Sequence, residues 1–361
     1  MEAEAIRAHF PVLRHTAYLN AGSEGPVPQR SMDAAARQLG IELDEGRSGA
    51  LHAARLEHLC EELREALAEL VGTGPEDVAL THSTTDGVNV VLAGLDLHTG
   101  DEVVTSDEEH PGLLGPLGEL RRRKGVSLRI APFASVAEAV SSRTCLVAVS
   151  HVSWMTGSLA PLEELRTAGA PLLLDGAQGA GAVPVDVAAL GCDYYAASGQ
   201  KWLCGPSGTG FLYVRPDRRE GLGMPRPAYG TIAEGTDPLE LEPRAGSRRF
   251  DTLEAAGPVL GAALAALQTL AEPGWDSLFE RARSLAARLR EMLRERARVE
   301  PGGPTTLVTF TPRGATDPAA AVATLAERGV VVRAIPGTPS LRASVGAWSN
   351  EEDLERLVRA L

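Results

Sequence analysis

The sequence predicts an α/β fold, with a mostly parallel sheet in a large domain and a second, smaller α+β domain. The first observation behind this prediction is that short apolar stretches alternate with helical patterns between about residues 78 and 200. The second is that polar clusters follow the apolar stretches, as expected where parallel strands end at a binding site. The third is length, because two domains are the usual outcome for 361 residues.

The composition disfavours several classes of partner. The chain is 44% hydrophobic, and its net charge of -13 argues against a general attraction to nucleic acid or anionic lipid. No apolar run approaches the roughly 20 residues of a membrane span, and MEAEAIRAHFPVL lacks the pattern of a secretion signal. We therefore expect a cytoplasmic protein without membrane or nucleic-acid partners. No CxxC pair is present, so no zinc site or disulfide framework is expected among Cys60, Cys145, Cys192 and Cys204.

The first half of the chain supplies the predicted sheet. Leucines recur every three or four residues between Leu51 and Val71, which predicts a helix with one buried face. DVALTHSTTDGVNVVLAGL then predicts a strand, a polar turn and a helix that begins near Thr84 and Thr85, which are good capping residues. Further strands are predicted for DEVVTSDEEH, VSLRIAPF, TCLVAVSHVSW and PLLLDGAQG, with a helix at GPLGELRRRKG. This alternation predicts parallel strands covered by helices.

The second half of the chain has a different pattern of predicted elements. CGPSGTGFLYVRP predicts a strand that runs antiparallel or lies at an edge, and the Gly- and Pro-rich stretch from Gly221 to Ser247 predicts a long connector. Two helices are predicted at about Ala255 to Leu270 and Trp275 to Arg296. A smaller α and β unit is predicted from TTLVTFTP, AAAVATLAERG, VVVRAIP, LRASVGAW and NEEDLERLVRAL.

Asp175 and Lys201 are the central pair of candidate functional residues. Asp175 ends the run Leu172 to Leu174, which predicts a strand buried on both faces, and a buried carboxylate is unfavourable without a nearby cation. Lys201 comes 26 residues later, after a crossover and another strand, so both side chains can reach one cavity. An amine that forms a Schiff base and a carboxylate that keeps a ring nitrogen protonated are what pyridoxal phosphate requires.

These motifs resemble those of fold-type I pyridoxal phosphate enzymes, and in particular the class V aminotransferase family. The sequence is most similar to the branch of cysteine desulfurases, selenocysteine lyases and isopenicillin N epimerases. The resemblance runs from YLNAGSEGPVP to LRASVGAWSNEEDLERL and is strongest in LLLDGAQGAGAVPVDVAALGCDYYAASGQKWLCGPSGTGFLYV. It implies the type I fold, pyridoxal 5'-phosphate as cofactor, and a Schiff base at Lys201.

The resemblance also implies how the cofactor is held. Gln178 would hydrogen-bond its phenolic oxygen. Thr84 and Thr85 match the family's phosphate-binding turn, where hydroxyls and free N–H groups at a helix start attract a dianion. Ser198 and Gln200 would complete this phosphate cup.

Further residues match positions around the ring and the substrate. His110, in DEEHPG, matches the histidine that stacks on the pyridine ring and relays protons. Arg342, in LRASVGAW, matches the arginine that grips the substrate's α-carboxylate through two parallel hydrogen bonds. Asn20, Ala21 and Gly22 match the N-terminal loop that approaches the substrate.

A further segment implies a dimer. RRFDTLEAAG, from Arg248 to Gly257, resembles a family segment that reaches the cofactor phosphate of the neighbouring subunit. Either Thr252 or Arg249 would make the contact. We therefore expect a homodimer with a shared active site.

The sequence departs from the desulfurases at several positions. The stretch ERGVVVRAIPGTPS before Arg342 contains no cysteine, so a persulfide-forming loop is not expected. Trp154 stands where desulfurases usually have an asparagine near the cofactor, and Gln200 where they often have histidine. Cys204 lies three residues after Lys201, but a small packing residue is the better interpretation of it.

Taken together, we expect an enzyme that acts on an amino acid, with Lys201, Asp175 and His110 as catalytic residues. β-Elimination, including carbon–sulfur cleavage, is the first interpretation, with transamination and then epimerisation as alternatives. A non-catalytic scaffold is disfavoured by the intact pair of Asp175 and Lys201. Residues 18–268 are expected to form the large cofactor-binding domain, and residues 1–17 and 269–361 the small one.

Overall fold

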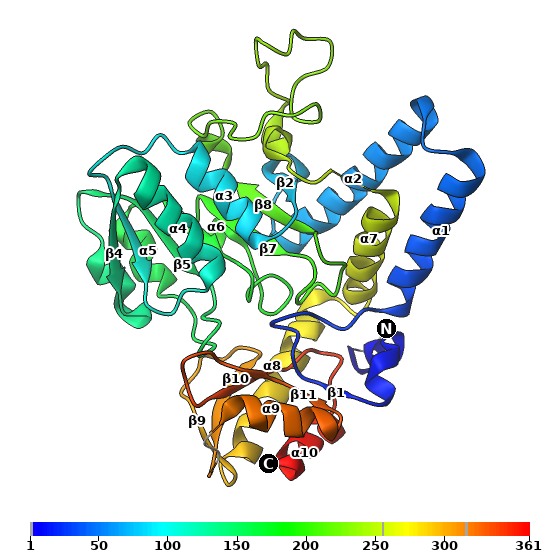
Figure 1. Cartoon of the computed structure of the whole chain (residues 1–361), viewed down its shortest axis with the longest axis vertical. Coiled ribbons are helices and arrows are strands. Elements are labelled where there is room, and N and C mark those ends of the chain that lie inside the picture. Colours follow the sequence, from blue (N-terminus) through cyan, green and yellow to red (C-terminus); the bar gives the residue numbers. More distant parts are fainter. Residues whose placement is uncertain (1–2, 255, 315–316) are drawn as a thin grey trace.

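The computed structural model describes residues 3–254, 256–314 and 317–361. Figure 1 shows a larger α/β part above a smaller part that holds the C-terminus, which confirms the predicted α/β class. Ala255, the first residue of one predicted helix, and residues 1–2 of the predicted small domain lie outside the described residues. Within the described residues no helix is long and apolar enough to cross a membrane.

In the described chain the large part is built on a seven-stranded sheet, in the order β2-β8-β7-β6-β5-β3-β4. The strands are β2 (Val78–Thr81), β3 (Glu102–Ser106), β4 (Ser127–Ala131), β5 (Thr144–Ser150), β6 (Leu172–Asp175), β7 (Tyr194–Ser198) and β8 (Gly210–Val214). β8 is antiparallel to both β2 and β7, whereas the other neighbouring pairs are parallel. The strand predicted from CGPSGTGFLYVRP is therefore antiparallel and lies inside the sheet. The carboxyl ends of β2, β3, β5, β6 and β7 meet at one edge.

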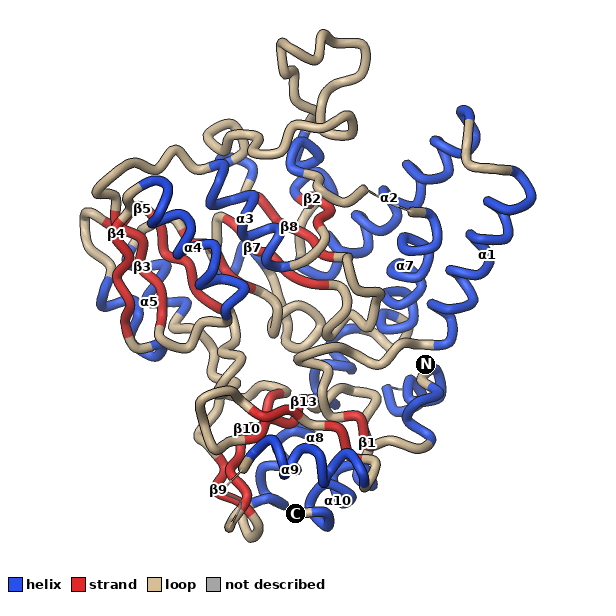
Figure 2. Tube along the Cα trace, viewed as in Figure 1, coloured by secondary structure: helices blue, strands red, loops and turns tan. Residues whose placement is uncertain are grey.

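Helices cover both faces of this sheet (Figure 2). Leu172 and Leu174 belong to one buried cluster and Leu173 to another, as expected for a strand buried on both faces. The first cluster includes residues of α2 (Gly49–Val71), α5 (Leu162–Ala168), α6 (Val187–Leu190) and α7 (Gly257–Ala271). The second includes residues of α3 (Thr84–Gly94) and α4 (Pro111–Lys124).

The start of α3 corrects one prediction. Ser83, and not Thr84 or Thr85, is the capping residue, because Ser83 has extended backbone angles and its Oγ accepts from the N–H of Asp86 at 3.1 Å. Thr84 and Thr85 are instead the first two residues of the helix. Their position leaves them at the positive end of the helix, where the predicted phosphate would lie.

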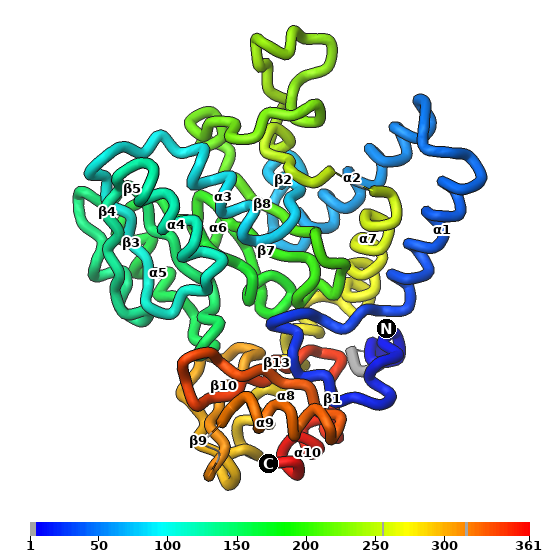
Figure 3. The backbone as a smooth tube through the Cα atoms, in the orientation of Figure 1, coloured from blue at the N-terminus to red at the C-terminus, as the bar shows by residue number. Residues whose placement is uncertain are grey.

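The smaller part combines the two ends of the chain. Its sheet has the order β12-β13-β10-β9, and the short parallel pair β1 and β11 brings residues 17–18 to the C-terminal part. In Figure 3 the blue N-terminal segment lies beside the orange and red C-terminal segments. The predicted domain boundaries place Tyr18 in the large domain although it pairs here with β11, and these boundaries stay a prediction. The elements are β1 (Ala17–Tyr18), α8 (Trp275–Leu293), β9 (Ala297–Val299), β10 (Leu307–Pro312), α9 (Pro318–Glu327), β11 (Val330–Val331), β12 (Arg333–Ala334), β13 (Leu341–Ser344) and α10 (Glu351–Ala360).

Shorter elements connect these parts. The predicted connector protrudes as a loop at the top of Figure 2 and ends in a 3-10 helix.

Helix α1 (Gln29–Glu45) packs against α7 and has no counterpart among the predicted elements. The 3-10 helices are η1 (Ala3–His9), η2 (Pro11–Arg14), η3 (Pro75–Asp77), η4 (Phe133–Ala139), η5 (Pro216–Arg218) and η6 (Gly246–Phe250).

Candidate active site

A cavity of about 360 Å³ lies between the carboxyl edge of the large sheet and the small part. The N-terminal segment contributes to one side of it, strand ends of the large sheet to another, and β12 and β13 to a third. Its lining residues are Tyr18, Asn20, Gly22, Ser23, Glu24, His110, Trp154, Gln178, Lys201, Arg333 and Arg342. Most of the sequence-predicted side chains around the ring and substrate therefore face one space.

Asp175 and Lys201 come together as the strand pattern predicts. Asp175 is the last residue of β6 and is 5% exposed, and its Oδ1 accepts from the N–H of Ala177 at 2.9 Å. Burial raises the pKa of Asp175, and the charge of Lys201 opposes this effect. Burial lowers the pKa of Lys201 to about 8, although the charge of Asp175 acts in the opposite direction. The two groups are thus electrostatically coupled in a largely dry site.

We expect the amine of Lys201 to react readily near neutral pH in the cofactor-free protein. A pKa of about 8 leaves roughly a tenth of the amine unprotonated at pH 7, whereas an ordinary lysine is almost wholly protonated. Reductive methylation with formaldehyde, followed by peptide mass spectrometry between about pH 6 and 10, measures this difference. The exposed Lys124, the other lysine of the chain, is an internal control.

The same experiment tests the coupling to Asp175. Because the carboxylate of Asp175 raises the pKa of Lys201, Asp175→Asn should move the midpoint of modification below pH 8. If Lys201 followed the same pH dependence as Lys124, or if the variant shifted the midpoint upward, this description of the site would be wrong.

Arg342 adds a second buried cation. It is 0% exposed, its Nη1 donates to the carbonyl of Trp154 at 2.8 Å, and its Nη2 lies 3.5 Å from the Oγ of Ser23. Burial and the nearby charge of Arg333 lower the pKa of Arg342 to about 9. The cavity therefore has an excess of positive charge in a protein whose net charge is -13.

His110 is neutral and has a defined tautomer. Burial, and then the charges of Lys201, Arg333 and Arg342, lower its pKa to about 4. Its Nδ1 accepts from the N–H of Gly112 at 3.0 Å, so the hydrogen of the neutral ring is on Nε2. Trp154 lies edge-on to His110, with ring centroids 5.1 Å apart. The stacking of His110 on a cofactor stays a prediction.

Gln178 is held by two partners that the sequence did not reveal. Its Nε2 donates to the carbonyl of Gly22 at 2.7 Å, and its Oε1 accepts from the Nε1 of Trp202 at 3.0 Å. Since an amide nitrogen carries two hydrogens, one N–H remains for another acceptor. A Cβ at Gly22 would come within 2.8 Å of polar side-chain atoms of Gln178 and Arg342, so glycine lets the N-terminal loop approach without displacing them.

The predicted phosphate cup joins the end of β7 to the start of α3. The Oγ of Ser198 accepts from the N–H of Thr84 at 2.8 Å and lies 2.7 Å from the Thr84 Oγ1. Only one of the two hydroxyl groups has to donate in the contact between Ser198 and Thr84, so the other hydroxyl can donate to an anion. Gly112 at the start of α4 lies close to Thr85, since a Cβ there would be 2.6 Å from the Thr85 Oγ1. Two helix N-termini thus meet beside the cup.

Buried polar atoms without partners test whether a polar cofactor and substrate fit this site. Such atoms are rare because their desolvation is costly. Around the cavity, and among the described residues, they include the Oε1 of Gln200, the Nε1 of Trp154, the Nε of Arg342 and the Oγ of Ser344. The two N–H groups and the hydroxyl, together with the positive charge of the cavity, fit the anionic groups of pyridoxal phosphate and of a carboxylate substrate, whereas the Gln200 oxygen can accept from a donor.

The remaining predicted residues have other contacts. The hydroxyl of Thr252 donates to Asp86 in the same chain, and Arg249 pairs with Glu220 at 3.1 Å. Their predicted contact with a neighbouring phosphate stays a prediction. Asn20 lines the cavity and accepts from Ser23 at 2.9 Å.

Two predicted small residues are fully buried. Ala21 is 0% exposed in a cluster with Phe10 and Trp348, so its side chain faces the core, and its substrate contact stays a prediction. Cys204 is also 0% exposed, and burial raises the pKa of its thiol well above the ordinary value. This burial agrees with its interpretation as a packing residue.

Arg333 is a lining residue that the sequence analysis missed. It lies on β12 directly opposite Arg342 on β13. Its guanidinium lies 5.5 Å from the ring centroid of Trp154, and its Nη1 donates to the Oγ of Ser23 at 3.1 Å. Only the register of the two short strands reveals this position.

Known proteins resemble this chain over almost its whole length. The family model described as aminotransferase class V matches residues 17–357. The isopenicillin N epimerase of Amycolatopsis lactamdurans is 33% identical over 379 residues, which covers 95% of this chain and 94% of the relative. A probable cysteine desulfurase of Pseudomonas aeruginosa is 32% identical over 397 residues, covering 98% and 96%.

Solved structures of one further protein, C-DES, have the same fold. C-DES with glycine covalently linked to its PLP cofactor matches with a TM-score of 0.92 and 29% identity, covering 98% of both chains. C-DES, described as a cystine C–S lyase, in complex with its product cysteine persulfide, matches with a TM-score of 0.90 and 29% identity, covering 97% of this chain and 98% of that chain. The likeness therefore includes both parts of the chain.

Proposed function

Because the chain belongs to the class V aminotransferase family, we propose that it is a pyridoxal phosphate enzyme acting on an amino acid. The reaction we favour is β-elimination with cleavage of a carbon–sulfur bond, since the similar C-DES is described as a cystine C–S lyase. The observation that carries the proposal is the coupled pair of Asp175 and Lys201 at the ends of β6 and β7, beside a cavity that also holds Arg342.

The residues of the cavity have complementary roles in this proposal. Bound pyridoxal phosphate would supply an electron sink for the α carbon of the substrate. Asp175 would keep the ring nitrogen protonated. Lys201, whose pKa is about 8, can take the α proton as a base and return it as an acid. Arg342 would orient the α-carboxylate through two parallel N–H bonds.

The proposed elimination needs no cysteine of the protein. Residues 328–341, which precede Arg342, contain none. Cys204 is fully buried and its thiol is protonated, so it is not a nucleophile. We therefore propose that the sulfur leaves with the product and is not transferred to the enzyme.

Epimerisation of an amino acid is a second candidate function. It is favoured by the 33% identity with an isopenicillin N epimerase over almost the whole chain. Both reactions begin with removal of the α proton, so both require the same lysine, and the products alone separate them.

We also propose that two copies form the working enzyme. Helix α1 and the start of α2 expose large apolar side chains, which monomeric proteins rarely gather on one region. These are Met32 at 60%, Leu39 at 56%, Leu43 at 84% and Leu51 at 82% exposure. A second copy would bury these side chains and bring the segment around Thr252 to the active site of the neighbouring subunit. A monomeric mass in light scattering would contradict this proposal.

The proposed function predicts defined products from S-substituted cysteines. We expect the purified protein to be yellow, and to release pyruvate, ammonia and the sulfur-containing fragment in equal amounts. Mass spectrometry of the products after incubation with a panel of S-substituted cysteines and other L-amino acids measures this. A keto acid formed only with an added acceptor would mean transamination, and inversion without pyruvate would mean epimerisation. A colourless protein that binds no pyridoxal phosphate would contradict the whole proposal.

A further inference from the structure

Two arginines lie opposite each other at the cavity. Arg333 and Arg342 are direct partners in the antiparallel pair of β12 and β13, so their side chains leave the sheet on the same face. Like charges at directly opposite positions are destabilising. Among the described residues neither arginine forms an ion pair with a carboxylate, and both contact Ser23 and Trp154. Glu24 lines the same cavity but is exposed and pairs with neither.

The cavity has one more cation than a simple amino acid can neutralise. Lys201 would be engaged with the cofactor, and Asp175 would face the cofactor ring. The phosphate would lie at the helix start near Thr84. The α-carboxylate of the substrate then neutralises Arg342, and the charge of Arg333 is still uncompensated.

Trp154 contacts both guanidinium groups. Arg342 donates to its backbone carbonyl, whereas Arg333 lies over its indole ring. Arg342 is fully buried and Arg333 is half-buried, so the second cation lies nearer to solvent. The Oγ of Ser23 contacts both groups, at 3.1 and 3.5 Å, which keeps them close. Two cations at different depths of one cavity can each bind one carboxylate of the same substrate.

From these observations we propose that Arg333 is a specificity residue that binds a second carboxylate, at the side-chain end of the substrate. The substrate class is therefore an amino acid whose β-substituent ends in a carboxylate. This inference rests on the proposed function, since it assigns the substrate of the same site.

A matched pair of substrates tests the proposal. S-(2-carboxyethyl)-L-cysteine and S-(2-carbamoylethyl)-L-cysteine differ only in a distal acid or amide. We expect kcat/KM to be about tenfold or more higher for the acid, mainly through KM, because charged hydrogen bonds are the stronger ones. Arg333→Met should remove this preference, so that the ratio of kcat/KM for the acid to kcat/KM for the amide falls to about one. Arg298→Met, an exposed arginine of the same small sheet, is the control and should change neither.

A binding measurement separates this proposal from the function. Calorimetric titration of the protein with glutarate and with its monoamide requires no turnover. We expect glutarate to bind about tenfold more tightly, and Arg333→Met to abolish the difference. Equal loss of affinity for both compounds in the variant would mean that both arginines hold one carboxylate, and would overturn the proposal. If no amino acid were turned over while glutarate kept its preference, the proposed function would fail and the dicarboxylate site would stand.

Discussion

Replacement of Lys201 by alanine is expected to lower kcat for every amino-acid substrate by about a thousandfold or more, which is about 4 kcal/mol of transition-state stabilisation. The amine is the group in the cavity whose pKa, about 8, suits it both to remove and to return a proton. His110 is a weaker base, because burial and then the positive charges around it lower its pKa to about 4. Steady-state kinetics with S-substituted cysteines measure the loss.

Several controls make this result specific. Borohydride should fix the cofactor to the wild-type protein at Lys201 and should not fix it to Lys201→Ala. Lys124→Ala, which changes the exposed second lysine, should behave as wild type in both assays. Methylamine added to Lys201→Ala should restore part of the rate, because a free amine can act as the missing base. If Lys201→Ala kept wild-type turnover, the assignment of the lysine would be wrong.

Local sequence patterns were sufficient to predict that Asp175 and Lys201 lie at the same edge of the sheet. The run of three leucines before Asp175 predicts a doubly buried strand, and the two buried clusters confirm that burial. Once that strand and the next were predicted, the parallel arrangement required both strand ends to lie at one edge. The pair of Asp175 and Lys201 follows from these two steps, because the direction of a chain in a parallel sheet determines where its ends lie.

Other features depend on tertiary contacts that no local pattern contains. Arg333 reaches the cavity only through its register with Arg342, and the two-residue strand that sets this register has no signal of its own. Helix α1 escaped detection because its buried residues include the small Ser31 and Ala34, while Leu39 and Leu43 are exposed. Ser83, Thr84 and Thr85 each have a hydroxyl that could cap α3. Only the backbone angles identify Ser83 as the capping residue.

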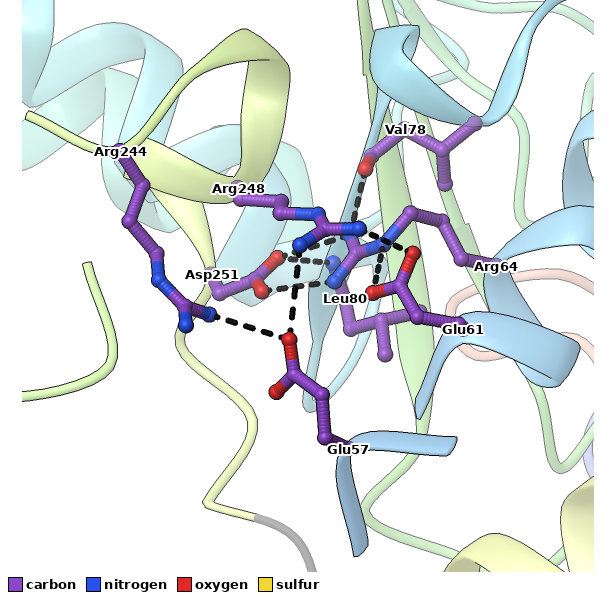
Figure 4. A network of polar contacts seen from close by, with 8 residues as sticks. All are labelled: Glu57, Glu61, Arg64, Val78, Leu80, Arg244, Arg248 and Asp251. Carbon is purple, nitrogen blue, oxygen red and sulfur yellow. Dashed lines mark hydrogen bonds and ion pairs between the residues drawn. The ribbon is translucent and has the colours of Figure 1, made fainter. Parts of the chain in front are cut away.

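An ion pair between the buried Arg64 and the half-buried Asp251 connects the core to the segment that carries Thr252 (Figure 4). Arg64 of α2 is 2% exposed, and its Nη1 and Nη2 donate to the two carboxylate oxygens of Asp251 at 3.1 and 2.8 Å. Its Nη1 also donates to the carbonyl of Val78 at 2.6 Å, and Asp251 accepts from the N–H of Leu80 at 2.8 Å. The pair therefore attaches both α2 and the segment after η6 to strand β2.

Arg64→Ala is expected to lower the free energy of unfolding by about 2–3 kcal/mol, because it leaves the half-buried Asp251 carboxylate without its cation. Denaturant unfolding with a double-mutant cycle, in which Asp251→Ala and the double variant are included, measures it. The double variant should lose less than the sum of the single variants.

The dependence on pH distinguishes lost charge pairing from lost packing. Burial already raises the pKa of Asp251 and the charge of Arg64 opposes this, so removal of Arg64 should raise that pKa further. A carboxyl group whose pKa is raised in the folded state destabilises the fold as the pH rises. The loss in free energy of unfolding that Arg64→Ala causes should therefore shrink as the pH falls toward the pKa that Asp251 has in the unfolded chain. Arg122→Ala, which breaks an exposed pair with Glu119, should leave the stability nearly unchanged at any pH. A deficit in Arg64→Ala that stayed constant with pH would mean that the arginine acts through its packed side-chain carbons, because only the ionised form of Asp251 requires its charge.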